Sequence, residues 1–175
     1  MVNVSRMLSQ LVLHEGLRLQ PYLDTEDNWT VLVGYNLSAR GWDDIERVLG
    51  RKIAPPGCTE EEPFGQPQLT KEDAMKVLRA DIERVQAAVL VYFPEYANLN
   101  EPRQRVCLDM AFNMGFRALG FKNAIAAIKR RDWSTASREL YKSKWARQVG
   151  DGPGGKIDRC DRLARMLLTG DDYTL

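Results

Sequence analysis

The chain has little of what several large classes of protein require. Its 175 residues include one histidine and three cysteines, and no two cysteines lie close together in the sequence. A zinc site, a disulfide framework and a Ser-His-Asp triad are therefore poor interpretations. A phosphate-binding GxxxxGK(S/T) loop is absent as well, so nucleotide binding has no support. We expect no metal ion and no cofactor.

Long apolar runs are also missing. No stretch approaches the roughly 20 residues that a membrane-spanning helix needs. The first residues, MVNVSRMLSQLVLHEG, show neither a basic leader nor a small-residue cleavage site, so we do not expect a signal peptide. With 44% hydrophobic residues and a net charge of +1, the chain can bury a core and is not disordered. These features predict a soluble protein that is made in a cytoplasm.

Charge is unevenly distributed along the chain. Residues 129–147 carry seven bases and two acids, although the whole chain is nearly neutral. Such a local basic face attracts polyanions, and it is also what an ordinary solvated helix face presents. A nucleic-acid-binding domain is the weaker interpretation, because no recognition motif accompanies the charge.

The apolar pattern predicts a mainly helical α+β fold. Residues 17–37 alternate and contain a Thr-Glu-Asp-Asn turn, which favours a small antiparallel β hairpin with Asp24 at or near its turn. Residues 50–68 hold four prolines and predict a loop. Elsewhere apolar residues recur at three- and four-residue steps. Helices are expected at 2–14, 42–49, 70–89, 103–114, 121–129, 133–145 and 157–168.

We expect one domain, 1–175, built from two lobes. The N-terminal lobe would cover about 14–69, and helix 2–14 would pack on the other lobe. Helix 70–89 would connect this lobe to a helical C-terminal lobe at 90–175, since it follows a small α/β half and precedes an all-helical half.

Three residues in the first 30 could carry out chemistry on a glycosidic bond. Glu15 falls at the end of the first helix, where the helix dipole disfavours its negative form. Asp24 falls in a polar turn that suits an ionised carboxylate, and Thr30 could hold a water beside it. Glycoside hydrolysis needs an acid and a second carboxylate in these states. By itself, an acid pair at this spacing is more often structural.

The surrounding residues resemble a known family. HEGLRLQPYLDTEDNWT is similar to the active-site segment of the T-even type bacteriophage lysozymes, glycoside hydrolase family 24. RVCLDMAFNMGFRALGFKNAIAAIKRRDW resembles the core helix of that family and the helices after it. KSKWARQ and DRCDRLARMLLTG follow in the same order and resemble the end of the family's sequence.

The resemblance implies a two-lobed lysozyme-like fold and an endo-acting muramidase. Its substrate would be the β-1,4 bond between N-acetylmuramic acid and N-acetylglucosamine in peptidoglycan. By this resemblance, Glu15 would be the general acid, while Asp24 and Thr30 would position water for a reaction that inverts the anomeric carbon. Arg159 matches the arginine that pairs with the catalytic glutamate, and Arg162 is the alternative for that role.

Further positions follow from the same resemblance. Phe112 matches an aromatic residue of the cleft, with Asn113 beside it, and Asn36 stands where a sugar amide could be met. Phe112 is equally well placed for a core role by its helical spacing. The chain departs from the family at Leu32, where a second glycine is usual, and at Tyr35, which replaces a histidine and its ion pair.

Two other functions stay open at this point. A non-catalytic peptidoglycan-binding protein on a lysozyme fold is one, for which Leu32 and Tyr35 are the hints. A lytic transglycosylase, which uses one catalytic acid, is the other. As an endolysin, the protein would be a monomer made in the host cytoplasm, without membrane insertion. It would reach the periplasmic wall after a holin-like partner permeabilises the membrane.

Overall fold

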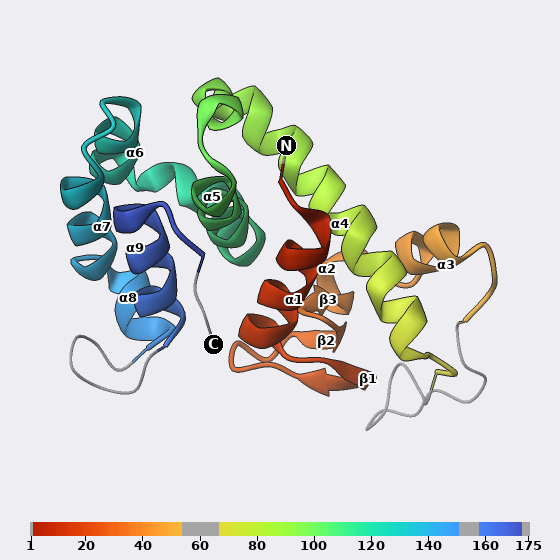
Figure 1. Ribbon diagram of the computed structural model, residues 1–175. Helices are drawn as coiled ribbons and strands as arrows, with labels where there is room; N and C mark the ends of the chain where they lie inside the picture. Colours follow the sequence, from red (N-terminus) through yellow and green to blue (C-terminus); the bar gives the residue numbers. More distant parts are fainter. Residues whose placement is uncertain (1, 54–66, 151–157, 173–175) are drawn as a thin grey trace. The chain divides into compact units, whose positions relative to one another are not determined.

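The computed structural model describes residues 2–53, 67–150 and 158–172 (Figure 1). It confirms a mainly helical α+β fold with a small antiparallel sheet near the N-terminus and a long helix in the middle. The elements in chain order are α1 (Val4–Glu15), β1 (Arg18–Leu23), β2 (Trp29–Leu32), β3 (Tyr35–Asn36), α2 (Leu37–Arg40), α3 (Asp43–Leu49), α4 (Lys71–Tyr92), the 3-10 helix η1 (Pro94–Asn98), α5 (Glu101–Met114), the 3-10 helix η2 (Gly115–Gly120), α6 (Lys122–Lys129), α7 (Trp133–Tyr141), α8 (Lys144–Gln148) and α9 (Arg159–Thr169).

Most predicted helices are present, and the differences are local. The single helix expected at 133–145 is two helices, α7 and α8. Ser143 explains the break, because its hydroxyl accepts a hydrogen bond from the backbone N–H of Ala146 and so caps a new helix. The short elements β3 and α2 were not predicted. Most of the loop expected at 50–68 lies outside the described residues.

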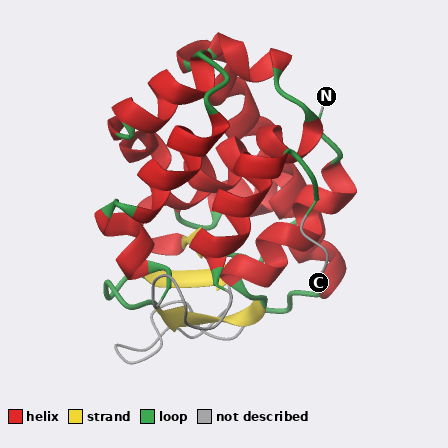
Figure 2. Cartoon of the chain, turned by 60° about the vertical axis from the view of Figure 1, so that its left-hand side comes forward, coloured by secondary structure: helices red, strands yellow, loops and turns green. Residues whose placement is uncertain are grey.

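The chain forms two compact units. Val4–Glu83 makes one, called the N-terminal unit here, and Arg84–Leu175 together with Met1–Asn3 makes the other, the C-terminal unit. The chain passes from the first to the second within α4, which is one continuous helix. The described strands all belong to the N-terminal unit, and the described residues of the C-terminal unit form helices and loops (Figure 2). The expected packing of the first helix on the other lobe stays a prediction.

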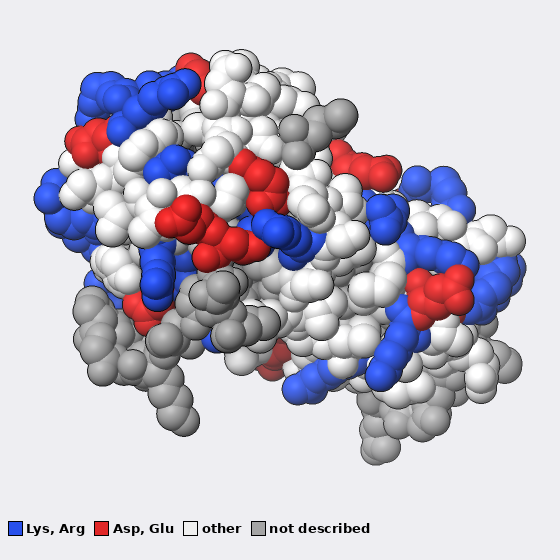
Figure 3. Space-filling view, in the orientation of Figure 1, with Lys and Arg blue, Asp and Glu red and all other residues white. Residues whose placement is uncertain are grey.

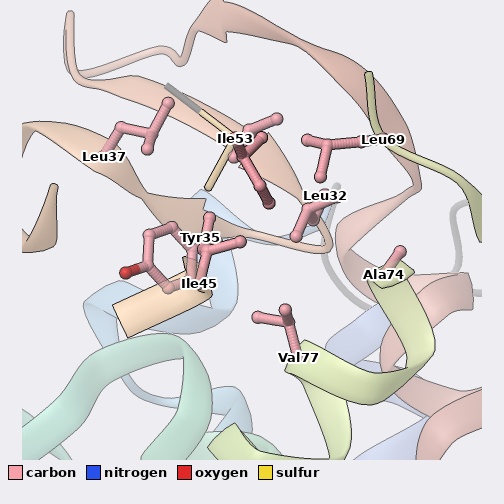
Figure 4. Packing of buried hydrophobic residues seen from close by; sticks show 9 residues of the cluster. Leu32, Tyr35, Leu37, Ile45, Ile53, Leu69, Ala74 and Val77 are labelled. Carbon is pink, nitrogen blue, oxygen red and sulfur yellow. The ribbon is translucent and has the colours of Figure 1, made fainter. Parts of the chain in front are cut away.

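The N-terminal unit is held together by one cluster of buried apolar side chains. The sheet contributes Leu32 and Tyr35, the loop after α3 contributes Ile53, and α4 contributes Ala74 and Val77 (Figure 4). The sheet thus packs against the first turns of α4 and against α3. This packing fixes strand β2, which carries Thr30 and follows the Asp24 turn.

Leu32 has an unusual backbone conformation for a leucine. Its φ is +58°, in the left-handed region that favours glycine, and its side chain is only 1% exposed. The side chain points into the cluster with Ile53, Leu69 and Ala74 (Figure 4). A non-glycine residue in this conformation costs about 1–2 kcal/mol, whereas burying a leucine stabilises by about 1.5–3 kcal/mol. Burial therefore offsets the strain, and the side chain fills the core.

Tyr35 and Arg40 form a polar group at the edge of the same cluster. The Tyr35 hydroxyl donates to the carbonyl oxygen of Gly41 at 3.0 Å, and the Arg40 guanidinium lies 4.1 Å from the centre of the Tyr35 ring. Arg40 also donates two hydrogen bonds, of 3.0 and 2.8 Å, to the buried Asp81 carboxylate on α4. An arginine thus ties the end of α2 to α4, and its two parallel bonds suit a buried carboxylate.

In the C-terminal unit, α5 and α9 are joined by several polar contacts. Asp109 is fully buried and accepts a 2.8 Å hydrogen bond from Nε of Arg159, the first residue of α9. Arg103 donates to the carbonyl oxygens of Leu167 and Leu168 near the end of α9. The bonds from Arg103 satisfy carbonyl groups in the last turn of α9, and the Asp109 contact holds its first residue. No helix in the described residues is long and apolar enough to cross a membrane.

The left-handed conformation of Leu32 leads to a test of stability. At ordinary strand positions glycine is less stable than alanine by about 0.5–1 kcal/mol, but at a left-handed position glycine is favoured. We therefore expect Leu32→Ala to lower the free energy of unfolding more than Leu32→Gly does. At the neighbouring buried Val33, whose φ is not positive, the order should be reversed. Urea denaturation of the four variants measures both orders. A Leu32→Gly variant less stable than Leu32→Ala would contradict the left-handed conformation of Leu32.

Candidate active site

Glu15 is the last residue of α1, and its side chain lies against the turn between β2 and β3. The helix ends there because Gly16 adopts a φ of +76° while its N–H still donates to the carbonyl oxygen of Val12 at 3.0 Å. A Cβ added to Gly34 would lie 3.2 Å from Oε2 of Glu15. The absence of a side chain at Gly34 therefore makes room for the carboxylate.

Asp24 closes the turn between β1 and β2 with its own carboxylate. Its Oδ1 accepts hydrogen bonds from the backbone N–H groups of Glu26 at 2.8 Å and Asn28 at 2.9 Å. Its backbone N–H donates to the carbonyl oxygen of Asn28 at 2.9 Å, and Asp27 supplies the positive φ of +58° that the turn needs. Aspartate is common in turns because its side chain can bond to the backbone in this way.

The second oxygen of Asp24 faces side chains. The Asn28 amide nitrogen lies 3.4 Å from Oδ2, and the Thr30 hydroxyl lies 3.5 Å from it. Partial desolvation raises the pKa of Asp24, but the hydrogen bonds from Asn28, Glu26 and Thr30 outweigh it, and the pKa lies below its ordinary value. A carboxylate that accepts several hydrogen bonds stays ionised at neutral pH.

The charges of both carboxylates act on the pKa of Tyr22. Tyr22 pairs with Thr30 across the β1–β2 ladder, and the guanidinium of Arg18 lies 4.2 Å from the centre of its ring. Burial raises the pKa of the Tyr22 hydroxyl, Arg18 lowers it, and the charges of Glu15 and Asp24 raise it further. The negative charges of Glu15 and Asp24 therefore both favour the protonated Tyr22 hydroxyl.

The strand register also places Asn36 next to Thr30, its partner in the β2–β3 ladder. The side-chain oxygen of Asn36 accepts a 2.8 Å hydrogen bond from the backbone N–H of Ala39, so Asn36 caps α2. This contact occupies the amide oxygen of Asn36.

The other predicted site residues belong to the C-terminal unit. Arg159 contacts Asp109, and only 6% of the Arg159 side chain is exposed. The Asn113 amide oxygen accepts a 2.9 Å hydrogen bond from the indole nitrogen of Trp145, and the half-buried Phe112 lines an apolar pocket. The structure thus brings Glu15, Asp24, Thr30 and Asn36 together in one unit. The pairing of Arg159 or Arg162 with Glu15 stays a prediction.

Three residues of these surroundings were not predicted from the sequence. Asn28 contributes a backbone and a side-chain donor to Asp24, Gly34 makes room for Glu15, and Asp109 holds Arg159. An asparagine four residues after an aspartate in a turn is a weak signal that could have suggested the first. Within residues 2–53, 67–150 and 158–172, no group of three His, Cys, Asp or Glu side chains could hold a metal ion.

A carboxylate at a helix end, a hydrogen-bonded second carboxylate and a nearby hydroxyl are the groups that a glycoside hydrolase uses. Comparison with known proteins agrees with this class. The sequence profile of the phage lysozyme family matches residues 12–161, so the chain belongs to the phage lysozyme family. Family membership makes it a glycoside hydrolase and suggests that it acts on peptidoglycan.

Individual relatives support the same family. Two probable T4-type lysozymes of Dictyostelium discoideum are 23% and 24% identical to this chain. These matches cover 95% and 83% of this chain and 96% and 88% of the relatives. The pre-baseplate central spike protein Gp5 of Enterobacteria phage T4 is 27% identical over 94% of the chain. The chain spans only 28% of the length of that spike protein.

Asn28 gives a direct test of how the Asp24 charge is held. We expect Asn28→Ala to raise the pKa of Asp24, because the variant loses the side-chain amide that favours the ionised form. Since the folded-state pKa is depressed, the stability that this contact contributes is present at neutral pH and is lost as the pH falls through that pKa.

The pKa can be measured by following the Asp24 carboxyl carbon in an NMR titration. Asn123→Ala is the matched control, because Asn123 contacts Glu139 in the C-terminal unit. An unchanged Asp24 pKa in Asn28→Ala would show that the backbone donors alone hold the charge.

Proposed function

We propose that this protein is an N-acetylmuramidase that hydrolyses the β-1,4 bond between N-acetylmuramic acid and N-acetylglucosamine in peptidoglycan. The observation that carries the proposal is the hydrogen-bonded Asp24 carboxylate with Thr30 beside it, in the same unit as Glu15 at the end of α1. Family membership supports the substrate class.

In this mechanism Glu15 donates a proton to the leaving oxygen of the glycosidic bond. Asp24 is ionised before the reaction and, with the Thr30 hydroxyl, orients a water molecule toward the anomeric carbon; as the water attacks, Asp24 accepts one of its protons. One Thr30 hydroxyl can donate to Asp24 at 3.5 Å or to the Asn28 carbonyl at 3.3 Å, so its lone pairs remain available to water. Attack by that water breaks the glycosidic bond and inverts the anomeric carbon.

The remaining assignments rest on the family resemblance. Arg159 would supply the positive charge beside Glu15, and Asn36, Phe112 and Asn113 would contact the sugar. The endolysin role, the need for a holin-like partner, action on the periplasmic wall and a monomeric state belong to the same proposal. The basic segment 129–147 suits an anionic wall, and added salt should weaken that attraction.

The hints that favoured a non-catalytic binding protein are weaker in the folded chain. Leu32 and Tyr35 are both 1% exposed and belong to the apolar cluster, so neither side chain changes the surface that a glycan would meet. Both departures from the family therefore lie among buried residues.

Glu15→Gln tests the proposed acid. The amide cannot donate the proton, so we expect the release of reducing ends from purified peptidoglycan to fall by about a hundredfold to ten-thousandfold. Glu26→Gln is the matched control, because it makes the same chemical change at an exposed carboxylate in the same unit. The same pair can be compared by loss of turbidity of permeabilised Gram-negative cells. Full activity of Glu15→Gln would sink the proposal, and wall binding without cleavage by the wild type would favour the non-catalytic alternative.

The products distinguish hydrolysis from lytic transglycosylation. Hydrolysis in water enriched in ¹⁸O should place the label on the new reducing end, and NMR immediately after cleavage should show the α anomer. Asp24→Asn should strongly reduce the rate, because the second carboxylate manages the water. An anhydro product with no added water, together with an active Asp24→Asn variant, would instead identify a transglycosylase.

A further inference from the structure

The C-terminal unit contains a pocket whose described lining includes none of the three proposed catalytic residues. Its volume is about 420 Å³, and its walls come from the second half of α4, from α5, and from η2 and α6. Ala88, Val89, Met110, Ala111, Ile125 and Ile128 are typical of the lining. Of the residues that the reaction is proposed to use, only Phe112 is in the wall. Glu15, Asp24 and Thr30 all belong to the N-terminal unit.

The walls of the pocket are almost entirely carbon and sulfur. Cys107 lines it, and burial raises the pKa of the Cys107 thiol to about 12, so the thiol stays uncharged at neutral pH. A volume of several hundred Å³ lined by apolar side chains, with few polar groups, is typical of a small-molecule site.

The pocket continues onto an exposed apolar surface. Tyr92 and Leu119 both line it, and they are 54% and 38% exposed. Val91, next to Tyr92, is 72% exposed. An apolar molecule could therefore enter from solvent without opening the fold.

An arginine side chain lies in the described wall of the pocket. The two segments that form most of the wall, 84–93 and 110–129, contain four bases and no acid. Arg84 is the one charged residue in the lining, and the Lys129 ammonium lies 5.8 Å from the centre of the Phe93 ring, which also lines the pocket. Lys129 pairs with Glu95 at 3.0 Å, just beyond the first segment. Figure 3 shows Lys and Arg side chains gathered over the loop between α6 and α7, at its upper left.

We propose that this pocket binds a single-chain aliphatic carboxylate, with the hydrocarbon chain inside and the carboxylate at the basic rim near Arg84. An apolar interior and a basic rim match the two halves of such a molecule. The charges argue against a neutral hydrocarbon as the preferred ligand. The proposal does not depend on the muramidase activity, because none of its tests uses cleavage of peptidoglycan.

Binding of decanoate and of decanol to the wild type tests the contributions of the hydrocarbon chain and of the carboxylate separately. Affinity measured by calorimetry should rise about fourfold for each methylene added to the carboxylate, the expectation for burial of a CH₂ group. Decanoate should bind about two- to fivefold more tightly than decanol, the range of an exposed ion pair. The ¹³C-methyl signal of Met110, which lines the pocket, should shift on titration and so locate the ligand.

Two pairs of variants on α4 provide matched controls. Ala88 lines the pocket and Ala87 is exposed outside it, so Ala88→Trp should abolish binding while Ala87→Trp leaves it unchanged. Arg84→Gln should bring decanoate to the affinity of decanol, whereas Arg79→Gln removes the same charge from an exposed site outside the lining and should have no effect. Thermal unfolding of each variant checks that it is folded.

Several results would overturn the proposal. Absence of a Met110 shift in the wild type would do so regardless of how the variants fold. Equal affinity for decanoate and decanol would remove the carboxylate from the proposal. Binding to anionic phospholipid vesicles without binding of free decanoate would assign the surface to a membrane, and a concentration-dependent dimer that blocks decanoate would assign it to a second copy of the chain.

Discussion

The hydrogen bonds to the Asp24 carboxylate are the interaction on which the candidate site depends. Two backbone N–H groups hold one oxygen, and side chains from Asn28 and Thr30 approach the other. The same contacts close the turn that sets the β1–β2 register and keep the carboxylate ionised. The same hydrogen-bond donors therefore hold the turn and keep Asp24 in the charge state that the proposed chemistry needs. A substitution at Asp24 acts on both, which is why Asn28 is the cleaner probe.

The small sheet owes its position to packing rather than to its own hydrogen bonds. Three short strands are marginal in water, and here the apolar cluster joins them to α3 and α4. Arg40 adds a paired contact from the end of α2 to the buried Asp81. This support matters for the proposed chemistry because Thr30, Gly34 and Asn36 lie on or between these strands.

The sequence predicted those parts of the fold that depend on local pattern. Most of the amphipathic helices, the break at Gly16 and the Asp24 turn follow from periodicity and turn chemistry, and the structure contains them. It did not predict that Leu32 adopts a left-handed conformation, because leucine avoids it unless tertiary burial compensates. Nor did it predict the break before α8, where one Ser143 hydroxyl outweighs an apolar pattern that continues through Trp145. Asp109 was overlooked because a buried acid in an apolar helix is recognised only through its partner, Arg159, fifty residues later.

The left-handed residues of the N-terminal unit also affect the unfolded chain. Asp27 and Leu32 both adopt a positive φ, and neither is a glycine. A residue with a side chain samples fewer backbone conformations when unfolded, so less conformational entropy is lost when the hairpin forms. The folded hairpin is locally strained, but the unfolded chain samples fewer backbone conformations than it would with glycine at these two positions. In this way a small sheet limits the entropic cost of its own assembly.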